Sequence, residues 1–255
     1  MKFDTQGWGL DRGNWGGLHG ILIAPRNRDP QLMVTFCHGF GAPGTDLVSL
    51  TEEIVPLLSD DLTPPAFFFP EGPIDLEETY GMPGASAWWP LNMAMLAELA
   101  AADDFSALQD QVPAGLDAAR TQLVEAITSC ASSKGWDSLS HVLGGFSQGS
   151  MLAVDTALRG ASLNVKGVVI WSGALICESV WREAHCHRAL QVPAFQSHGT
   201  QDSILPVSAG RALNQFLSDL GWTIDGMEFQ GPHTIPMAGI EGAARLIEGA
   251  ITQSK

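Results

Sequence analysis

Leu143-Gly144-Gly145-Phe146-Ser147-Gln148-Gly149-Ser150 is the stretch that decides the fold, because it joins two segments of different periodicity. The apolar residues 141–144 before it suit a buried strand, and the residues from Met151 to Leu158 after it suit a helix. Glycines stand on both sides of Ser147 and permit a tight turn in which the serine takes a strained backbone conformation. The stretch therefore predicts a strand, a serine turn and a helix in immediate succession.

Strand and helix patterns alternate along the chain on either side of this turn. Continuous apolar runs predict strands at 18–24, 31–37, 66–69, 141–144, 165–171, 192–197 and 223–229. Helical spacing of apolar residues predicts helices at 47–58, 93–102, 113–135, 148–158, 206–220 and 239–251. This alternation predicts an α/β fold with a mostly parallel central sheet and helices on both faces. Because the sequence has no internal repeat or linker, we expect a single domain over residues 1–255.

Residues 71–111 interrupt the alternation with turn-forming glycines and prolines and a pair of tryptophans. We expect this segment to be a cap-like insertion over one end of the sheet. Trp88, Trp89 and Met82 are its candidate substrate-pocket residues, and the alternative is that these side chains only cover the core.

The charge balance limits the possible partners. The chain carries 13 basic and 28 acidic residues, a net charge of −15, with a pI near 4.6. Nucleic acid and anionic membrane surfaces are poor partners, because binding to phosphate depends on clustered Lys and Arg. No apolar run reaches the length of a membrane span, and the start of the sequence lacks the apolar core of a secretory signal. We therefore expect no membrane insertion and a cytoplasmic location, while the oligomeric state stays open.

The serine at the turn needs two partners to become a nucleophile. A histidine must take its proton, and a carboxylate must orient that histidine. In the α/β-hydrolase order both follow the serine, each in a loop after a strand. Asp202 and His233 follow the last two predicted strands, whereas Asp219 and Asp225 do not lie in such loops. We predict Ser147, Asp202 and His233 as the catalytic residues of an α/β-hydrolase fold.

The oxyanion formed in acyl transfer needs two preorganised N–H donors. One is expected to be the backbone of Gln148, where the following helix directs its positive end at the site. The other is expected from the Gly-rich loop at residues 38–41, at Phe40. His38 is interpreted as a group that orients this loop.

A second group of polar residues contains types that can bind metals: Glu178, His185, Cys186 and His187. Adjacent His, Cys and His residues are unlike the spaced ligand pairs of metal centres. The four cysteines are irregularly spaced and do not suggest a disulfide framework. We expect no metal and no cofactor.

Four motifs together resemble the phospholipase/carboxylesterase family, which includes the acyl-protein thioesterases. They are His38-Gly39-Phe40-Gly41, Gly145-Phe146-Ser147-Gln148-Gly149, His198-Gly199-Thr200-Gln201-Asp202-Ser203-Ile204-Leu205-Pro206 and Gly231-Pro232-His233-Thr234-Ile235-Pro236. The resemblance runs from Leu18 onward and implies the α/β-hydrolase fold. It also implies Ser147 as nucleophile, Asp202 as acid and His233 as base, with the oxyanion donors given above.

Departures from the family pattern in two motifs concern the substrate. Ser86 stands where the family often has arginine, and Pro232 precedes the last motif's histidine. Met237 or Ala238 occupies a place that is often acidic. These positions fall in the walls expected to bind the acyl and alcohol groups.

The sequence thus predicts a serine carboxylic-ester hydrolase that acts on short to medium acyl esters through an acyl-enzyme. The expected partner is a small-molecule ester or thioester. Alternative activities are those of a lysophospholipase or an acyl-protein thioesterase. A non-catalytic α/β-hydrolase scaffold used for binding is disfavoured, because all three catalytic positions are present.

Overall fold

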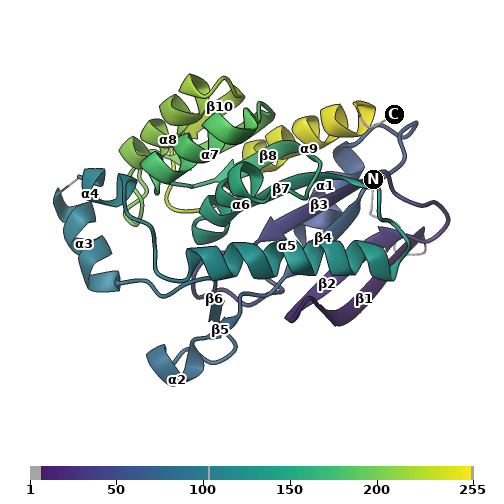
Figure 1. Ribbon diagram of the computed structural model, residues 1–255, viewed down its shortest axis with the longest axis horizontal. Coiled ribbons are helices and arrows are strands. Elements are labelled where there is room, and N and C mark those ends of the chain that lie inside the picture. The colour runs from purple at the N-terminus through teal and green to yellow at the C-terminus, as the bar shows by residue number, and fades with distance from the viewer. Residues whose placement is uncertain (1–6, 103, 254–255) are drawn as a thin grey trace.

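The computed structural model describes residues 7–102 and 104–253, and within them the main sheet has eight strands in the order β1-β2-β4-β3-β7-β8-β9-β10. They are β1 (Trp8–Trp15), β2 (Leu18–Pro25), β3 (Leu32–Cys37), β4 (Ala66–Pro70), β7 (Ser140–Phe146), β8 (Val165–Trp171), β9 (Pro193–Gly199) and β10 (Thr223–Phe229). β1 and β4 each pair antiparallel with β2, whereas the pairs from β4 to β10 are parallel. The predicted mostly parallel sheet is confirmed (Figure 1).

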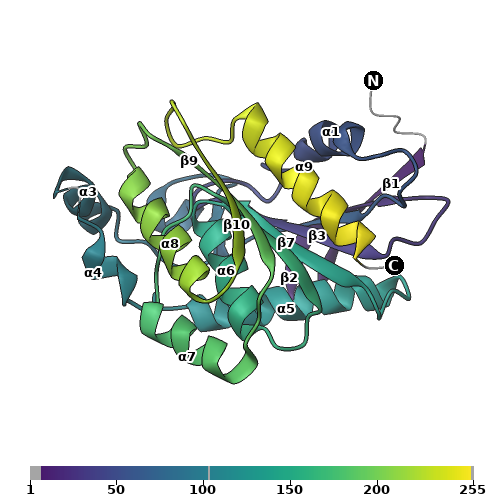
Figure 2. The ribbon, with the colours of Figure 1, turned by 90° about the horizontal axis from the view of Figure 1, so that it is seen from above.

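Helices cover both faces of this sheet. They are α1 (Leu50–Ile54), which continues into a 3₁₀ turn at Val55–Leu57, and α5 (Leu116–Ser133), α6 (Gln148–Arg159), α7 (Glu178–Arg188), α8 (Val207–Asp219) and α9 (Met237–Thr252). One core layer contains side chains of α5, α6, α7 and α8, and the other contains side chains of α1 and α9. Figure 2 shows α1 and α9 on the side of the sheet opposite α5, α6 and α7.

The continuous apolar strands follow from these two layers. Every residue of β3 is buried. Met33 packs in the layer with α5 and α6, while its neighbour Val34 packs in the layer with α1 and α9. Because successive side chains of a strand point to opposite faces, a strand covered on both sides is apolar throughout.

β1 and α7 have no counterpart among the predicted elements. β1 is an edge strand with several exposed residues, and it joins β2 through a two-residue turn at Gly16 and Gly17. Both glycines have positive φ, at 56° and 89°, as a type I′ hairpin turn requires. In α7, Trp181 is the one buried residue, so the helix lacks a clear apolar stripe.

The segment at 71–111 folds as short elements: β5 (Ile74–Asp75), α2 (Glu77–Tyr80), β6 (Ser86–Ala87), α3 (Met93–Ala102) and α4 (Ser106–Gln109). β5 and β6 form a separate antiparallel ribbon. In Figure 1, α3 and α4 lie at one end of the molecule, and α2 projects beyond the ribbon. Its description as a cap-like insertion within a single domain stays a prediction.

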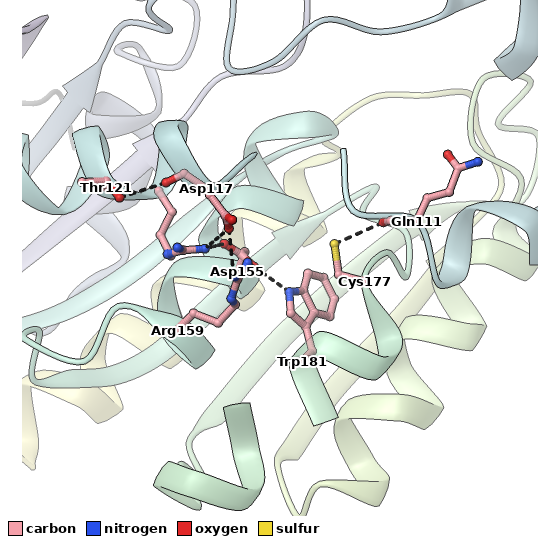
Figure 3. A network of polar contacts seen from close by, with 8 residues as sticks. Gln111, Asp117, Thr121, Asp155, Arg159, Cys177 and Trp181 are labelled. Atoms are coloured by element: carbon pink, nitrogen blue, oxygen red, sulfur yellow. Dashed lines mark hydrogen bonds and ion pairs between the residues drawn. The ribbon is translucent and has the colours of Figure 1, made fainter. Parts of the chain in front are cut away.

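A network of charges connects α5, α6 and α7 on one side of the sheet. Asp155 on α6 is buried and lies 3.0 Å from Arg120 and 3.1 Å from Arg159. The indole of Trp181 donates a hydrogen bond to Asp155 at 2.7 Å, and both arginines also contact the exposed Asp117 (Figure 3). The network therefore holds the helix that follows Ser147.

No helix in the described part of the chain combines the length and the apolar composition that crossing a membrane would require.

Candidate active site

Ser147 lies between β7 and α6 in the strained conformation that its sequence context predicts. Its φ is 54° and its ψ is −119°, and its N–H donates to the Trp171 carbonyl at 2.9 Å. A Cβ on Gly145 or Gly149 would collide with the carbonyl of Cys37 on the neighbouring strand. The two glycines are thus required because the backbone of the turn lies directly against β3.

Asp202 and His233 follow the adjacent strands β9 and β10, and they contact each other across their loops. His233 Nδ1 lies 2.5 Å from Asp202 Oδ2, while Asp202 Oδ1 accepts from the N–H groups of Ile204 and Leu205, each at 2.9 Å. Burial alone would raise the pKa of Asp202, but these hydrogen bonds lower it below its ordinary value. Asp202 is therefore an ionised hydrogen-bond acceptor at neutral pH.

His198 is a second histidine beside Asp202. Its ring is buried, its Nε2 lies 2.7 Å from the Leu205 carbonyl, and the same nitrogen lies 3.5 Å from Asp202 Oδ2. Burial lowers the pKa of His198 more than the Leu205 carbonyl and the Asp202 charge raise it. A neutral His198 whose Nε2–H donates to Leu205 supports the loop that carries Asp202.

An apolar cavity of about 410 Å³ brings the candidate residues together. Ser147, Gln148, Phe40 and His233 line it, and Trp89 forms part of its wall. Most of the remaining wall comes from the segment after the tryptophans and from the loops after β8 and β9; it includes Leu91, Met95, Leu96, Leu108, Val112, Met151, Ile176, Ile204 and Leu205. A separate hollow of about 450 Å³ beside α8 and β10 contains neither Ser147 nor His233. The apolar cavity is therefore the candidate site.

Two of the three predicted pocket residues lie elsewhere. Among the residues that the structure describes, neither Trp88 nor Met82 lines the cavity. Trp88 is turned into the core, where its indole donates to the His38 carbonyl at 2.9 Å. Met82 is 37% exposed and approaches Gly41 from outside. Of the three residues predicted for the substrate pocket, Trp89 lines this cavity and Trp88 and Met82 do not, and the assignment of the substrate pocket itself stays a prediction.

His38 fixes the loop that contains Phe40. Its Nε2 accepts a hydrogen bond from the Gly72 N–H at 2.9 Å, so Nδ1 carries the proton and donates to the Gly39 carbonyl at 2.8 Å. Burial lowers the pKa of His38 despite the opposing effects of this carbonyl and of nearby Asp46 and Glu71. A neutral His38 with a hydrogen bond at each ring nitrogen is suited to the predicted role of orienting the loop.

The competing residues are engaged elsewhere. Asp219 accepts a hydrogen bond from Gln215 at 2.8 Å, and Asp225 pairs with Arg245 at 3.4 Å. Across the described residues, no group of three His, Cys, Asp or Glu side chains is placed to hold a metal ion.

Residues 19–250 match the model of a family described as Phospholipase/Carboxylesterase. The chain belongs to this family. It is a hydrolase with the α/β-hydrolase fold, and the predicted family and fold are confirmed.

Proteins similar to this chain include two thioesterases and an esterase. The chain is similar to acyl-protein thioesterase 1 of Eremothecium gossypii, with 27% identity over 204 residues that cover 79% of this chain and 80% of that protein. Acyl-protein thioesterase 1 of Saccharomyces cerevisiae is 21% identical over 207 residues, covering 79% of this chain and 84% of that protein. The crystal structure of esterase PE8 matches with a TM-score of 0.71 and 24% identity, over 91% of this chain and 98% of that one. At this identity the structural match supports the fold.

Proposed function

We propose that this protein is a serine carboxylic-ester hydrolase that acts through an acyl-enzyme on short to medium acyl esters. The observation that carries the proposal is the Asp202–His233 contact, whose histidine lines the same apolar cavity as Ser147. A nucleophile and a base that line one cavity, with a carboxylate hydrogen-bonded to the base, are the groups that acyl transfer needs.

The proposed reaction has two half-reactions, and in each of them His233 first accepts a proton and then donates it. Ser147 Oγ attacks the ester carbonyl carbon while His233 Nε2 takes its proton, and Asp202 stabilises the resulting imidazolium through Nδ1–H. The backbone N–H groups of Phe40 and Gln148 bind the oxyanion. His233 then gives the proton to the departing alcohol. Water repeats the sequence on the acyl-enzyme and releases the carboxylic acid.

The cavity wall favours an uncharged, apolar acyl group. Among the described lining residues there is no Lys or Arg, and Asp46 is the one carboxylate. An anionic headgroup would find no cationic partner there, which disfavours acidic lysophospholipids as substrates. A volume of about 410 Å³ lies toward the low end of ligand pockets, which span roughly 300–1,000 Å³. Short to medium acyl chains fit this size.

The second candidate function is thioester hydrolysis. It is favoured by the similarity to two proteins named acyl-protein thioesterase 1. The same serine attack applies to a thioester carbonyl. Rates for a short p-nitrophenyl ester and a long-chain acyl thioester, compared as kcat/KM, separate the two, and we expect the short ester to be preferred.

The test of the proposed function is labelling by a fluorophosphonate together with hydrolysis of p-nitrophenyl esters. We expect the wild type to take one label and to hydrolyse the esters, and Ser147→Ala to do neither. A wild-type protein that is folded but takes no label would refute the proposal and favour the non-catalytic scaffold.

A further inference from the structure

Trp88 is buried between the two segments that carry the proposed oxyanion donors, and only 1% of its surface is exposed. Its indole N–H donates to the His38 carbonyl at 2.9 Å, and its ring is tilted by 34° against the His38 imidazole, with centroids 5.3 Å apart. Its backbone N–H donates to Gln148 Oε1 at 3.0 Å. One residue thus hydrogen-bonds to both sides of the proposed oxyanion hole.

The side chain of Gln148 completes the connection. It is buried, and its Nε2 donates to the Trp89 carbonyl at 2.8 Å while its Oε1 accepts from Trp88. Both ends of the amide are therefore paired with the backbone of one dipeptide, and this determines the orientation of the side chain. Because Gln148 is the first residue of α6, these hydrogen bonds also fix the position of the start of that helix. The backbone N–H of Gln148, one of the two proposed oxyanion donors, lies at this point.

The other donor segment is bound to the same stretch. The N–H of Gly41 donates to the Ser86 carbonyl at 3.0 Å, and the N–H of Ser86 donates to the Ala42 carbonyl at 3.1 Å. Ser86 Oγ lies 3.1 Å from His38 Nε2. Phe40 therefore lies in a loop that is hydrogen-bonded on both sides to residues 86–88.

We propose that Trp88 and the side chain of Gln148 are positioning residues that hold the two oxyanion donors at a constant separation. This inference rests on the proposed function. The donors stabilise charge only when they are placed beforehand at the position of the developing oxyanion. Residues 86–89 form a brace between the loop at 38–42 and the start of α6. Loosening the brace therefore weakens binding of the transition state more than binding of the substrate.

The first test is Trp88→Phe, which removes the indole donor and keeps an aromatic ring against His38. Active sites are counted by fluorophosphonate titration, so that misfolded protein does not contribute to kcat. We expect kcat per labelled site to fall about 10- to 100-fold, with KM within twofold, because loss of a whole oxyanion donor costs roughly 100- to 1,000-fold. An alkylboronic acid, whose serine adduct mimics the tetrahedral intermediate, should bind more weakly by a similar factor.

Trp222→Phe is the matched control. Trp222 is also buried, and its indole donates to a backbone carbonyl, that of Leu190, at 2.8 Å. It lies outside the cavity lining, so we expect its kcat per labelled site to stay within twofold of wild type.

Gln148→Met is a second variant that keeps the backbone N–H and removes both side-chain hydrogen bonds, and we expect the same loss in kcat. Changes below twofold in both brace variants would overturn the inference. So would a raised KM with unchanged kcat, because that would place Trp88 in substrate binding. A wild type that takes no label would instead refute the proposed function, and the inference with it.

Discussion

Asp155 and Asp202 are both buried aspartates, but the partners that stabilise their negative charges differ. Asp155 lies between two arginines and a tryptophan indole, a set of partners that includes two permanent positive charges (Figure 3). Asp202 accepts hydrogen bonds from two backbone N–H groups and from His233, none of which is permanently charged. The negative charge of Asp155 is balanced by arginines in the folded protein. The negative charge of Asp202 has no permanently charged partner of this kind and can stabilise a positive charge that forms on His233.

This difference shows what each carboxylate is suited to do. A buried charge that is paired with arginine holds helices together, and removal of one partner leaves an uncompensated charge. A buried charge that is held by neutral donors can stabilise an imidazolium that exists only during the reaction. We therefore expect changes at Asp155 to affect stability and changes at Asp202 to affect catalysis.

The largest expected effect is that of Asp202→Asn. The amide keeps an oxygen for the Ile204 and Leu205 N–H groups but places an N–H donor opposite His233, which favours the wrong tautomer of the ring. We expect kcat for a p-nitrophenyl ester to fall about 10⁴-fold. The midpoint of thermal unfolding should fall by less than it does for Asp155→Asn. A variant with more than a tenth of the wild-type kcat would remove Asp202 from the proposed mechanism.

Asp155→Asn should produce the opposite pattern. Arg120 and Arg159 would retain only the exposed Asp117, so we expect the free energy of unfolding to fall by about 3 kcal/mol in urea titrations. At a temperature well below unfolding, kcat/KM should stay within twofold of wild type. A large loss of kcat in folded protein would contradict the division of roles.

Arg120→Met is a smaller change in the same network. Arg159 continues to pair with Asp155 at 3.1 Å, and the methionine replaces the apolar part of the arginine stem. We expect a loss of about 1–2 kcal/mol in the free energy of unfolding, less than for Asp155→Asn. The two values are measured side by side in urea, and the reverse order would contradict our account of the network.

The smallest expected effect is a pH dependence at Asp202. Its pKa is lower in the folded state than the ordinary value of 3.8. Its stabilising contribution is therefore complete above about pH 4 and is lost as the pH falls through the lowered pKa. Below pH 4, the unfolding temperature of the wild type should fall more steeply than that of Asp202→Asn. Parallel curves would indicate that Asp202 has the same pKa in both states.

Parts of this comparison were predictable from the sequence and parts were not. Asp202 and His233 could be selected because each stands in a loop after a strand, in the order that a serine turn requires. The partners of Asp155 on other helices, Arg120 and Trp181, could not be predicted, since they carry no shared motif. Gly16 and Gly17 form a dipeptide that is typical of a hairpin turn. The strand β1 before it lacks a continuous apolar run because several of its residues are exposed, so apolar patterning did not predict it.

The sequence by itself determined the serine turn, the alternation of strands and helices, and the order of the candidate catalytic residues. These features depend on neighbours along the chain, namely apolar periodicity and glycines at a tight turn. Only the tertiary structure decided that Trp88 points to His38 while Trp89 points to the cavity. The two residues are adjacent and chemically identical, so their roles depend on contacts with segments far away in the sequence.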